Sequence, residues 1–103
     1  MEELEMQIMN IIVYAGDCKN HAYGALRKAK EKNFEEAEKE MKLAEESISK
    51  AHDFQTAMIQ KEANGEKVEL SVLFVHAQDH LMTAMSEKTL IQEIIELRKS
   101  INC

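Results

Sequence analysis

The feature that most constrains this chain is its lack of proline: none occurs in 103 residues, and glycine occurs only three times. Without proline, nothing forces a long helix to lose a backbone hydrogen bond or to kink. Residues of good helix propensity, such as Ala, Glu, Lys, Leu and Met, fill most other positions. We therefore predict an all-α protein whose breaks fall at the few turn signals that remain.

Small and apolar residues recur at steps of three and four along most of the sequence. This periodicity predicts a first helix over about residues 2–32, a second over about 34–64 and a third from about 71 to 101. Because the connections are short, consecutive helices should pack antiparallel. The whole chain, residues 1–103, is predicted to be a single domain, an antiparallel three-helix bundle.

The predicted helix ends carry capping signals. Asn33, followed three residues later by Glu36, is typical of a capping box at the start of the second helix. Gly65, after an asparagine, can end that helix, and Ser71 can cap the third. Gly16 lies inside the first predicted helix, where we expect either a close approach of another helix or a bend.

The third predicted helix is apolar on two sides when its residues are placed on a wheel at about 100° each. One side carries polar groups among apolar ones: Val72, His76, Asp79, His80, Thr83, Leu90, Ile91 and Ile94. The opposite side carries Phe74, Leu81, Met82 and Met85. A three-helix bundle covers only one face of each helix. The surplus face predicts self-association through the third helix.

Composition excludes several classes of function. The formal net charge of −6 argues against a nucleic-acid partner, which would need clustered Lys and Arg. No apolar run approaches the roughly 18 residues of a membrane span, and the first residues lack a basic signal-peptide start, so a cytoplasmic location is expected. Cys18 and Cys103 are too few and too far apart for a disulfide framework or a thiolate zinc site, and are expected to be inert.

The candidate functional site is the polar segment around His76 and His80 in the third helix. A structural interpretation makes these histidines hydrogen-bonded core or interface residues. A metal interpretation rests on their i, i+4 spacing with Asp79 between them, similar to an inverted zinc-peptidase pattern with Asp in place of Glu, but it lacks a third ligand. A nucleophilic interpretation has the neutral imidazole of His76 attack an activated phosphorus.

The string FVHAQDHLMT, residues 74–83, closely resembles the active-site helix of the lactose/cellobiose family of phosphotransferase-system (PTS) IIA components. Shorter matches are YAGD at residues 14–17, AH at 51–52, QT at 55–56, and EA at 62–63 with Gly65. The resemblance therefore extends over almost the whole chain.

The resemblance implies a phosphocarrier that acts during import of a β-disaccharide such as lactose, cellobiose or chitobiose. Its phosphoryl donor would be the histidine phosphocarrier HPr. Its acceptor would be a cysteine of the IIB component, which serves the membrane component IIC. The carrier would form a homotrimer, bind no sugar itself and need no organic cofactor.

The resemblance also assigns roles to single residues. His76 would be the phosphorylated histidine, with Gln78 and His80 as supporting neighbours able to orient its imidazole or phosphate. Asp79 would lie on the threefold axis and share one metal ion, usually Mg²⁺, with its two copies. The alternative is a non-enzymatic helical oligomerisation module whose polar helix face only specifies assembly. His52 is expected at a core boundary with a structural hydrogen bond, and His21 at the surface.

Overall fold

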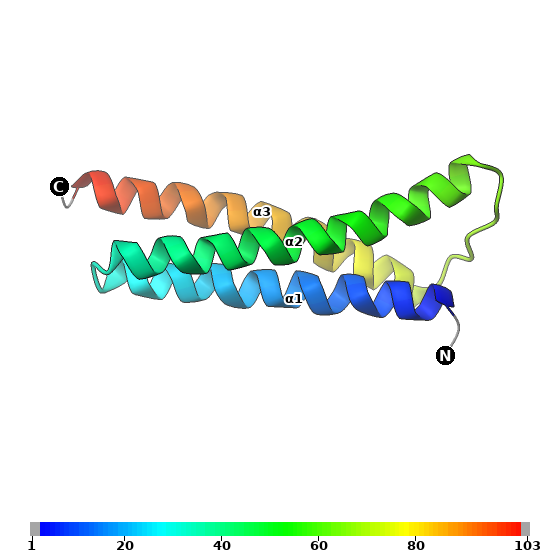
Figure 1. Cartoon of the computed structure of the whole chain (residues 1–103), viewed down its shortest axis with the longest axis horizontal. Helices are drawn as coiled ribbons and strands as arrows, with labels where there is room; N and C mark the ends of the chain where they lie inside the picture. Colours follow the sequence, from blue (N-terminus) through cyan, green and yellow to red (C-terminus); the bar gives the residue numbers. More distant parts are fainter. Residues whose placement is uncertain (1–2, 102–103) are drawn as a thin grey trace.

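Three long helices make up most of the computed structural model, which describes residues 3–101. Helix α1 is Glu3–Lys30, α2 is Phe34–Ala63 and α3 is Val72–Ile101. They lie along one another in an elongated bundle (Figure 1), and no strand occurs within the described range. The prediction of an all-α three-helix bundle is confirmed, with helix ends close to those expected.

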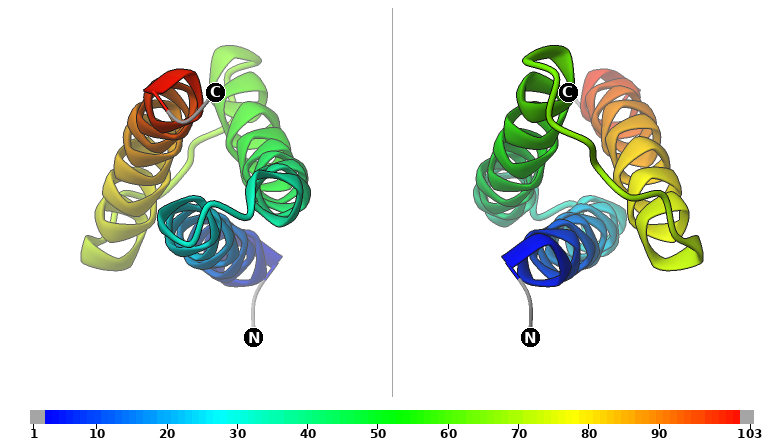
Figure 2. Two further views of the ribbon diagram at one scale, coloured as in Figure 1. Left: turned by 90° about the vertical axis from the view of Figure 1, so that its left-hand side faces the viewer. Right: turned by 90° about the vertical axis from the view of Figure 1, so that its right-hand side faces the viewer.

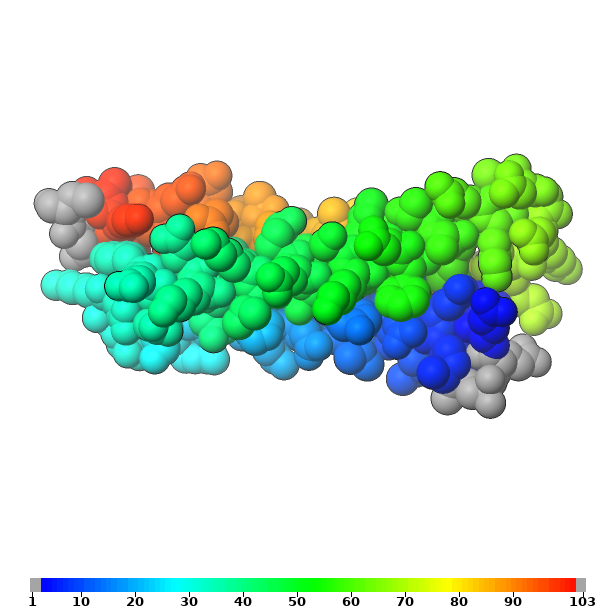
Figure 3. Space-filling model, viewed as in Figure 1, coloured from blue at the N-terminus to red at the C-terminus, as the bar shows by residue number. Residues whose placement is uncertain are grey.

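The chain reverses direction at each connection, so α1 and α3 run parallel and α2 runs against both (Figure 1). Seen end-on, the helices occupy the corners of a triangle (Figure 2). Helix α1 packs most closely against α2, then α3, while α2 and α3 contact each other least. The result is a rod of 53 × 24 × 19 Å (Figure 3).

Alanine dominates the buried positions of the bundle, so the helix backbones can approach closely. Nine alanines are fully buried: Ala15, Ala22, Ala25, Ala29, Ala37, Ala44, Ala51, Ala77 and Ala84. The largest fully buried side chains are Ile11, Leu81 and Cys18. No polar or charged side chain within residues 3–101 belongs to the buried core. The polar residues of interest therefore lie on seams and surfaces.

Helix α1 ends in a Schellman motif that contains no glycine. The amide of Asn33 donates to the carbonyl of Lys28 at 2.9 Å, and the amide of Lys32 donates to that of Ala29 at 3.0 Å. Lys32 takes the left-handed position with φ of 64°. A side chain there is conformationally costly, because glycine is the residue that adopts this region freely.

Helix α2 ends in the same motif with glycine in the left-handed position. Glu66 donates its amide to Lys61 at 3.0 Å and Gly65 donates to Glu62 at 3.1 Å, with φ of 88° at Gly65. The predicted cap at this point is confirmed.

The two predicted N-caps are also present. The Asn33 side chain accepts the amide of Glu36 at 3.3 Å, and the Ser71 hydroxyl accepts the amide of Phe74 at 3.1 Å. The reciprocal half of the capping box is not made, because the Asn33 amide already donates to the Lys28 carbonyl; the Glu36 carboxylate lies 3.4 Å from Lys39 Nζ.

The orientation of α3 corrects the predicted division of its faces. The sequence pattern places Ile91 on the side of His76, but Ile91 is 4 % exposed and belongs to the core with Leu81. The pattern places Met82 on the side of Leu81, but Met82 is 55 % exposed. The fully buried Ala77 and Ala84 lie on the side of α3 that faces the bundle and mark this rotation. The uncovered side carries an apolar stripe: Val72, Val75, Met82, Leu90, Ile94, Leu97 and Ile101. The predicted surplus face is therefore present: it keeps Val72, Leu90 and Ile94 of the predicted His76 side, and its centre is roughly 50° from the centre expected.

None of the helices in the described part of the chain is long and apolar enough to cross a membrane.

Candidate functional site

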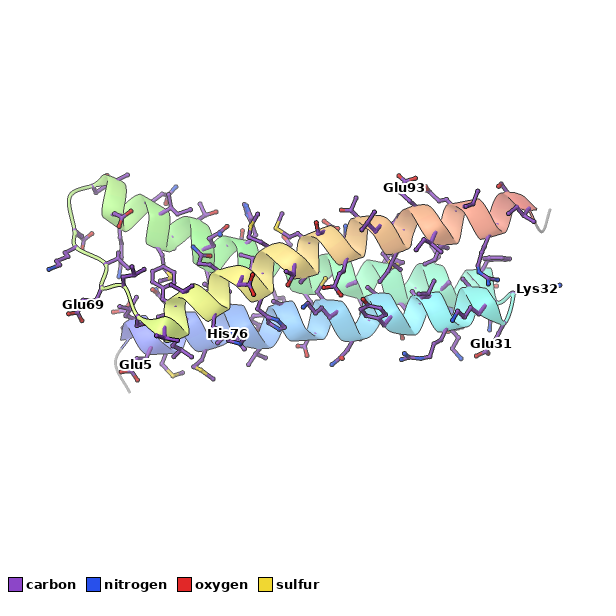
Figure 4. The ribbon with its side chains drawn as sticks, turned by 180° about the vertical axis from the view of Figure 1, so that it is seen from behind. Glu5, Glu31, Lys32, Glu69, His76 and Glu93 are labelled. Carbon is purple, nitrogen blue, oxygen red and sulfur yellow. The ribbon has the colours of Figure 1, made fainter. Side chains whose placement is uncertain are left out.

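His76 stands in the second turn of α3, where this helix runs beside α1 (Figure 4). Its ring is exposed, while the next residue, Ala77, is fully buried against the bundle. The packed alanine fixes the backbone, and the imidazole projects from it toward solvent. A partner molecule can therefore reach the ring without any rearrangement of the fold.

His80 lies one turn further along α3 and stacks on His76. The ring centroids are 5.9 Å apart and the planes differ by 13°. This contact follows from helix geometry, since side chains at i and i+4 are neighbours on one face. The predicted proximity of His80 to the His76 imidazole is thus present in the structure.

His80 is held against α1 at a glycine. A Cβ atom at Gly16 would lie 3.5 Å from Nε2 of His80, in ordinary van der Waals contact, so the ring packs directly against this position of α1. Of the two expectations for Gly16, close helix approach is the correct one. Burial lowers the pKa of His80, and the charges of Lys19 and His76 lower it further. His80 is therefore biased toward its neutral form.

A charged network continues along the same seam between α1 and α3. Lys19 Nζ lies 3.3 Å from Glu87 Oε2, and the Tyr23 hydroxyl donates to Glu87 Oε1 at 2.6 Å. Hydrogen bonds from Tyr23 and Lys19 lower the pKa of Glu87. Sequence reasoning missed Lys19 and Glu87; the signal that could have led to them was Gly16, which marks the α1 face that meets His80.

Gln78 does not lie beside His76 within one chain. Residues two apart on a helix point roughly 200° away from each other, so they do not share a face. Gln78 instead accepts a hydrogen bond from Gln55 of α2 at 2.8 Å. The expectation that Gln78 is a neighbour of the imidazole is therefore not met inside a single subunit.

Asp79 is exposed and lies within the apolar stripe of α3. Its carboxylate makes no hydrogen bond or ion pair with any described residue, whereas its backbone carbonyl accepts the Thr83 hydroxyl at 2.9 Å. Within residues 3–101 of one chain, no three His, Cys, Asp or Glu side chains are close enough to hold a metal ion. A carboxylate surrounded by exposed apolar residues is an unusual surface feature.

The remaining histidines and cysteines lie away from His76. His21 is half-buried and its Nδ1 is 2.8 Å from Glu40 Oε2, so it joins α1 to α2 rather than standing free on the surface. His52 is exposed, and the expected structural hydrogen bond is not found among the described residues. Burial raises the pKa of Cys18 to about 11, which makes its thiol inert as predicted. Cys103 lies outside the described residues.

Fold and site together define a class of protein: a three-helix bundle with an exposed imidazole on one helix. A model of the family described as "PTS system, Lactose/Cellobiose specific IIA subunit" matches residues 6–99. The chain belongs to this family, and it is a phosphotransfer component of a sugar phosphotransferase system. The family assignment made from residues 74–83 is confirmed.

Individual relatives agree over nearly the full length. The lichenan-specific phosphotransferase enzyme IIA component of Bacillus subtilis is 49 % identical over 100 residues, which cover 97 % of this chain and 91 % of that protein. The crystal structure of the PTS cellobiose-specific enzyme IIA from Bacillus anthracis has a TM-score of 0.95 at 44 % identity and covers 99 % of this chain and 94 % of that one. A solution structure of the IIA(chitobiose)–HPr complex from Escherichia coli has a TM-score of 0.85 at 38 % identity, with full coverage of both chains.

Proposed function

We propose that this chain takes a phosphoryl group from phospho-HPr onto a ring nitrogen of His76 and passes it to a cysteine of a IIB component in the cytoplasm. The observation that carries the proposal is the exposed His76 imidazole on a helix fixed by buried Ala77. The similarity to a IIA protein solved in complex with HPr supports the choice of donor.

The transfer is a pair of displacements at phosphorus. The lone pair of a His76 nitrogen forms the new P–N bond while the donor's P–N bond breaks and leaves its electron pair on the donor imidazole. In the second step the thiolate of the acceptor attacks the phosphorus, and the electron pair of the P–N bond returns to His76. No oxidant, reductant or further reactant is required.

His80 supports this step by position and by charge. Its ring stacks on His76 at 5.9 Å and limits the orientations that the reactive imidazole can adopt. Because burial lowers the pKa of His80 and favours its neutral form, this ring does not add a positive charge beside the His76 imidazole. A neutral ring can also offer a hydrogen bond to an incoming phosphate oxygen.

We further propose that the chain assembles as a homotrimer through the apolar stripe of α3. The stripe is long and exposed, with Ile94 the most covered member at 43 %, and an exposed apolar face of this extent favours a partner surface. Around a threefold axis, the stripe of each copy would meet the other two. Asp79 lies within it and would then meet its own copies.

Three such carboxylates would repel one another unless a cation were present. The donor set fits Mg²⁺, since carboxylate oxygens are its preferred ligands and Asp79 has no other ionic partner among the described residues. We propose that Asp79 of each copy would hold the shared ion. The ion would supply charge neutralisation at the axis.

The labelling experiment separates this function from the alternative of a purely structural oligomerisation module. The purified chain is incubated with HPr, the general phosphotransferase proteins and labelled phosphoenolpyruvate. We expect an acid-labile, base-stable label that is lost in His76→Ala and retained in the matched controls His52→Ala and His21→Ala. An unlabelled wild-type chain would favour the structural module, and label that persists in His76→Ala would place the phosphoryl group elsewhere.

A further inference from the structure

The ion pair between Lys19 and Glu87 lies along the seam that also holds the two stacked histidines. Lys19 follows Gly16 by one turn of α1, and Gly16 is the residue that meets Nε2 of His80 at 3.5 Å. The Lys19 and Glu87 side chains are 25 % and 32 % exposed, so both are partly sheltered but able to move. Glu87 lies about three turns beyond His76 on α3, so the pair is a charged group on the same seam as the histidines, and the transfer step described above does not involve it.

Glu87 is fixed independently of Lys19. The Tyr23 hydroxyl donates to Oε1 at 2.6 Å, while Lys19 binds the other oxygen, Oε2, at 3.3 Å. If the ammonium left, Glu87 would still keep its shorter hydrogen bond. The arrangement therefore has one anchored carboxylate and one long, flexible cation.

Phosphorylation changes the balance of charge along this seam. A phosphoryl group on His76 adds about two negative charges, against one on Glu87. Lys19 lies about one turn after Gly16 on α1, Gly16 packs against the His80 ring, and that ring stacks on His76. A mobile ammonium with three donors can move along the seam toward the stronger anion.

We propose that Lys19 is a positioning residue for the phosphorylated state: its ammonium leaves Glu87 for the phosphoryl group on His76, and Glu87 takes it back after transfer. This inference rests on the proposed function, because it requires His76 to carry the phosphoryl group. Glu87 acts as the competing carboxylate that keeps the phosphorylated state from becoming too stable to pass its group onward.

Two substitutions should act in opposite directions. Lys19→Met should lower the phosphorylated fraction at equilibrium with phospho-HPr by about three- to fivefold, as expected for one partly exposed charge pair. Glu87→Gln removes the competitor and should raise that fraction. Lys88→Met is the matched control, because Lys88 pairs with Glu45 and removing it subtracts the same charge from the chain. Circular dichroism of every variant checks that the helices remain.

A second readout distinguishes direct contact with phosphate from a structural effect. In a phosphorus NMR titration of the phosphorylated chain, losing a nearby cation should raise the second pKa of the phosphoryl group in Lys19→Met but not in Lys88→Met. The difference between wild type and Lys19→Met should shrink as salt is raised, because the pair is partly exposed. Equal behaviour of Lys19→Met and Lys88→Met in a chain that is labelled on His76 would overturn the role of Lys19 alone. A wild-type chain that takes no label on His76 would overturn the proposed function and this inference with it.

Discussion

Gly16 of α1 and His80 of α3 meet so closely that a Cβ at position 16 would lie 3.5 Å from the imidazole Nε2. That distance is an ordinary van der Waals contact, so one methyl group fits and a larger side chain does not. The α1–α3 seam thus sets the position of the ring that stacks on His76.

Two substitutions at Gly16 should therefore separate stability from transfer. Gly16→Ala should raise the free energy of unfolding by about 0.5–1 kcal/mol, because alanine is the better helix former, and should leave phosphoryl transfer close to wild type. Gly16→Leu should displace His80 and slow transfer from phospho-HPr. Urea unfolding measures the stability of each variant, and a time course of phosphoryl transfer from phospho-HPr measures its rate. Equal transfer rates in the two variants would contradict the positional role of His80.

The left-handed Lys32 predicts a stabilising change far from the site. Lys32→Gly should raise the free energy of unfolding by about 1 kcal/mol, because glycine adopts φ of 64° without steric cost. Gly65 occupies the equivalent position after α2, so Gly65→Ala should destabilise the chain by a similar amount. Thermal and urea unfolding of the two variants should shift in opposite directions; a shift in the same direction would show that the φ of Lys32 carries no strain.

Features that depend on neighbouring residues in the sequence were predicted correctly, whereas the packing of side chains between helices was not. Asn33, Ser71 and Gly65 act on their own neighbours along the sequence, so their caps could be predicted without knowing the fold. The family was also predictable, because the string around His76 is specific to it. The predicted rotation of α3 about its own axis was wrong: Ile91 is buried and Met82 is exposed. This rotation is set by contacts with α1, which are remote in sequence.

The site shows the same division between local and remote information. His76 and His80 stack because they are one turn apart, which sequence gives directly. Lys19 reaches this seam from a different helix, and its partner Glu87 gives no periodic signal of its own. Contacts of this kind depend on how α1 and α3 are set against each other, which the hydrophobic pattern alone does not specify.

Acid should weaken the fold partly through His80. Burial lowers the pKa of this ring in the folded state below its ordinary value near 6.5, so the unfolded chain binds the proton more readily. This contribution to stability is complete above the ordinary pKa and is lost as pH falls through the folded one. Between pH 7.5 and 5, wild type should lose more unfolding free energy than His80→Gln, as measured by urea unfolding at each pH. Parallel curves for the two proteins would contradict the prediction.

Asp79 predicts a metal-dependent assembly. If Mg²⁺ holds three copies together, chelation should shift the wild-type chain from trimer toward monomer in sedimentation velocity. Asp79→Leu extends the apolar stripe and removes the repulsion, so its trimer should withstand the chelator. Asp79→Asn serves as the control that removes charge without adding apolar surface. A wild-type trimer that ignores chelation, together with a monomeric Leu variant, would exclude the proposed ion site.

The opposed positions of His76 and Gln78 predict cooperation between subunits of the proposed trimer. The two residues flank the apolar stripe on opposite sides, and in a threefold ring the two flanks of neighbouring copies face each other. Gln78 of one copy would therefore support His76 of the next. Mixing His76→Ala with Gln78→Ala subunits should restore transfer above that of either variant alone, because some interfaces would combine an intact histidine with an intact glutamine. Transfer that equals the average of the two parent variants would instead confine the role of Gln78 to its hydrogen bond with Gln55.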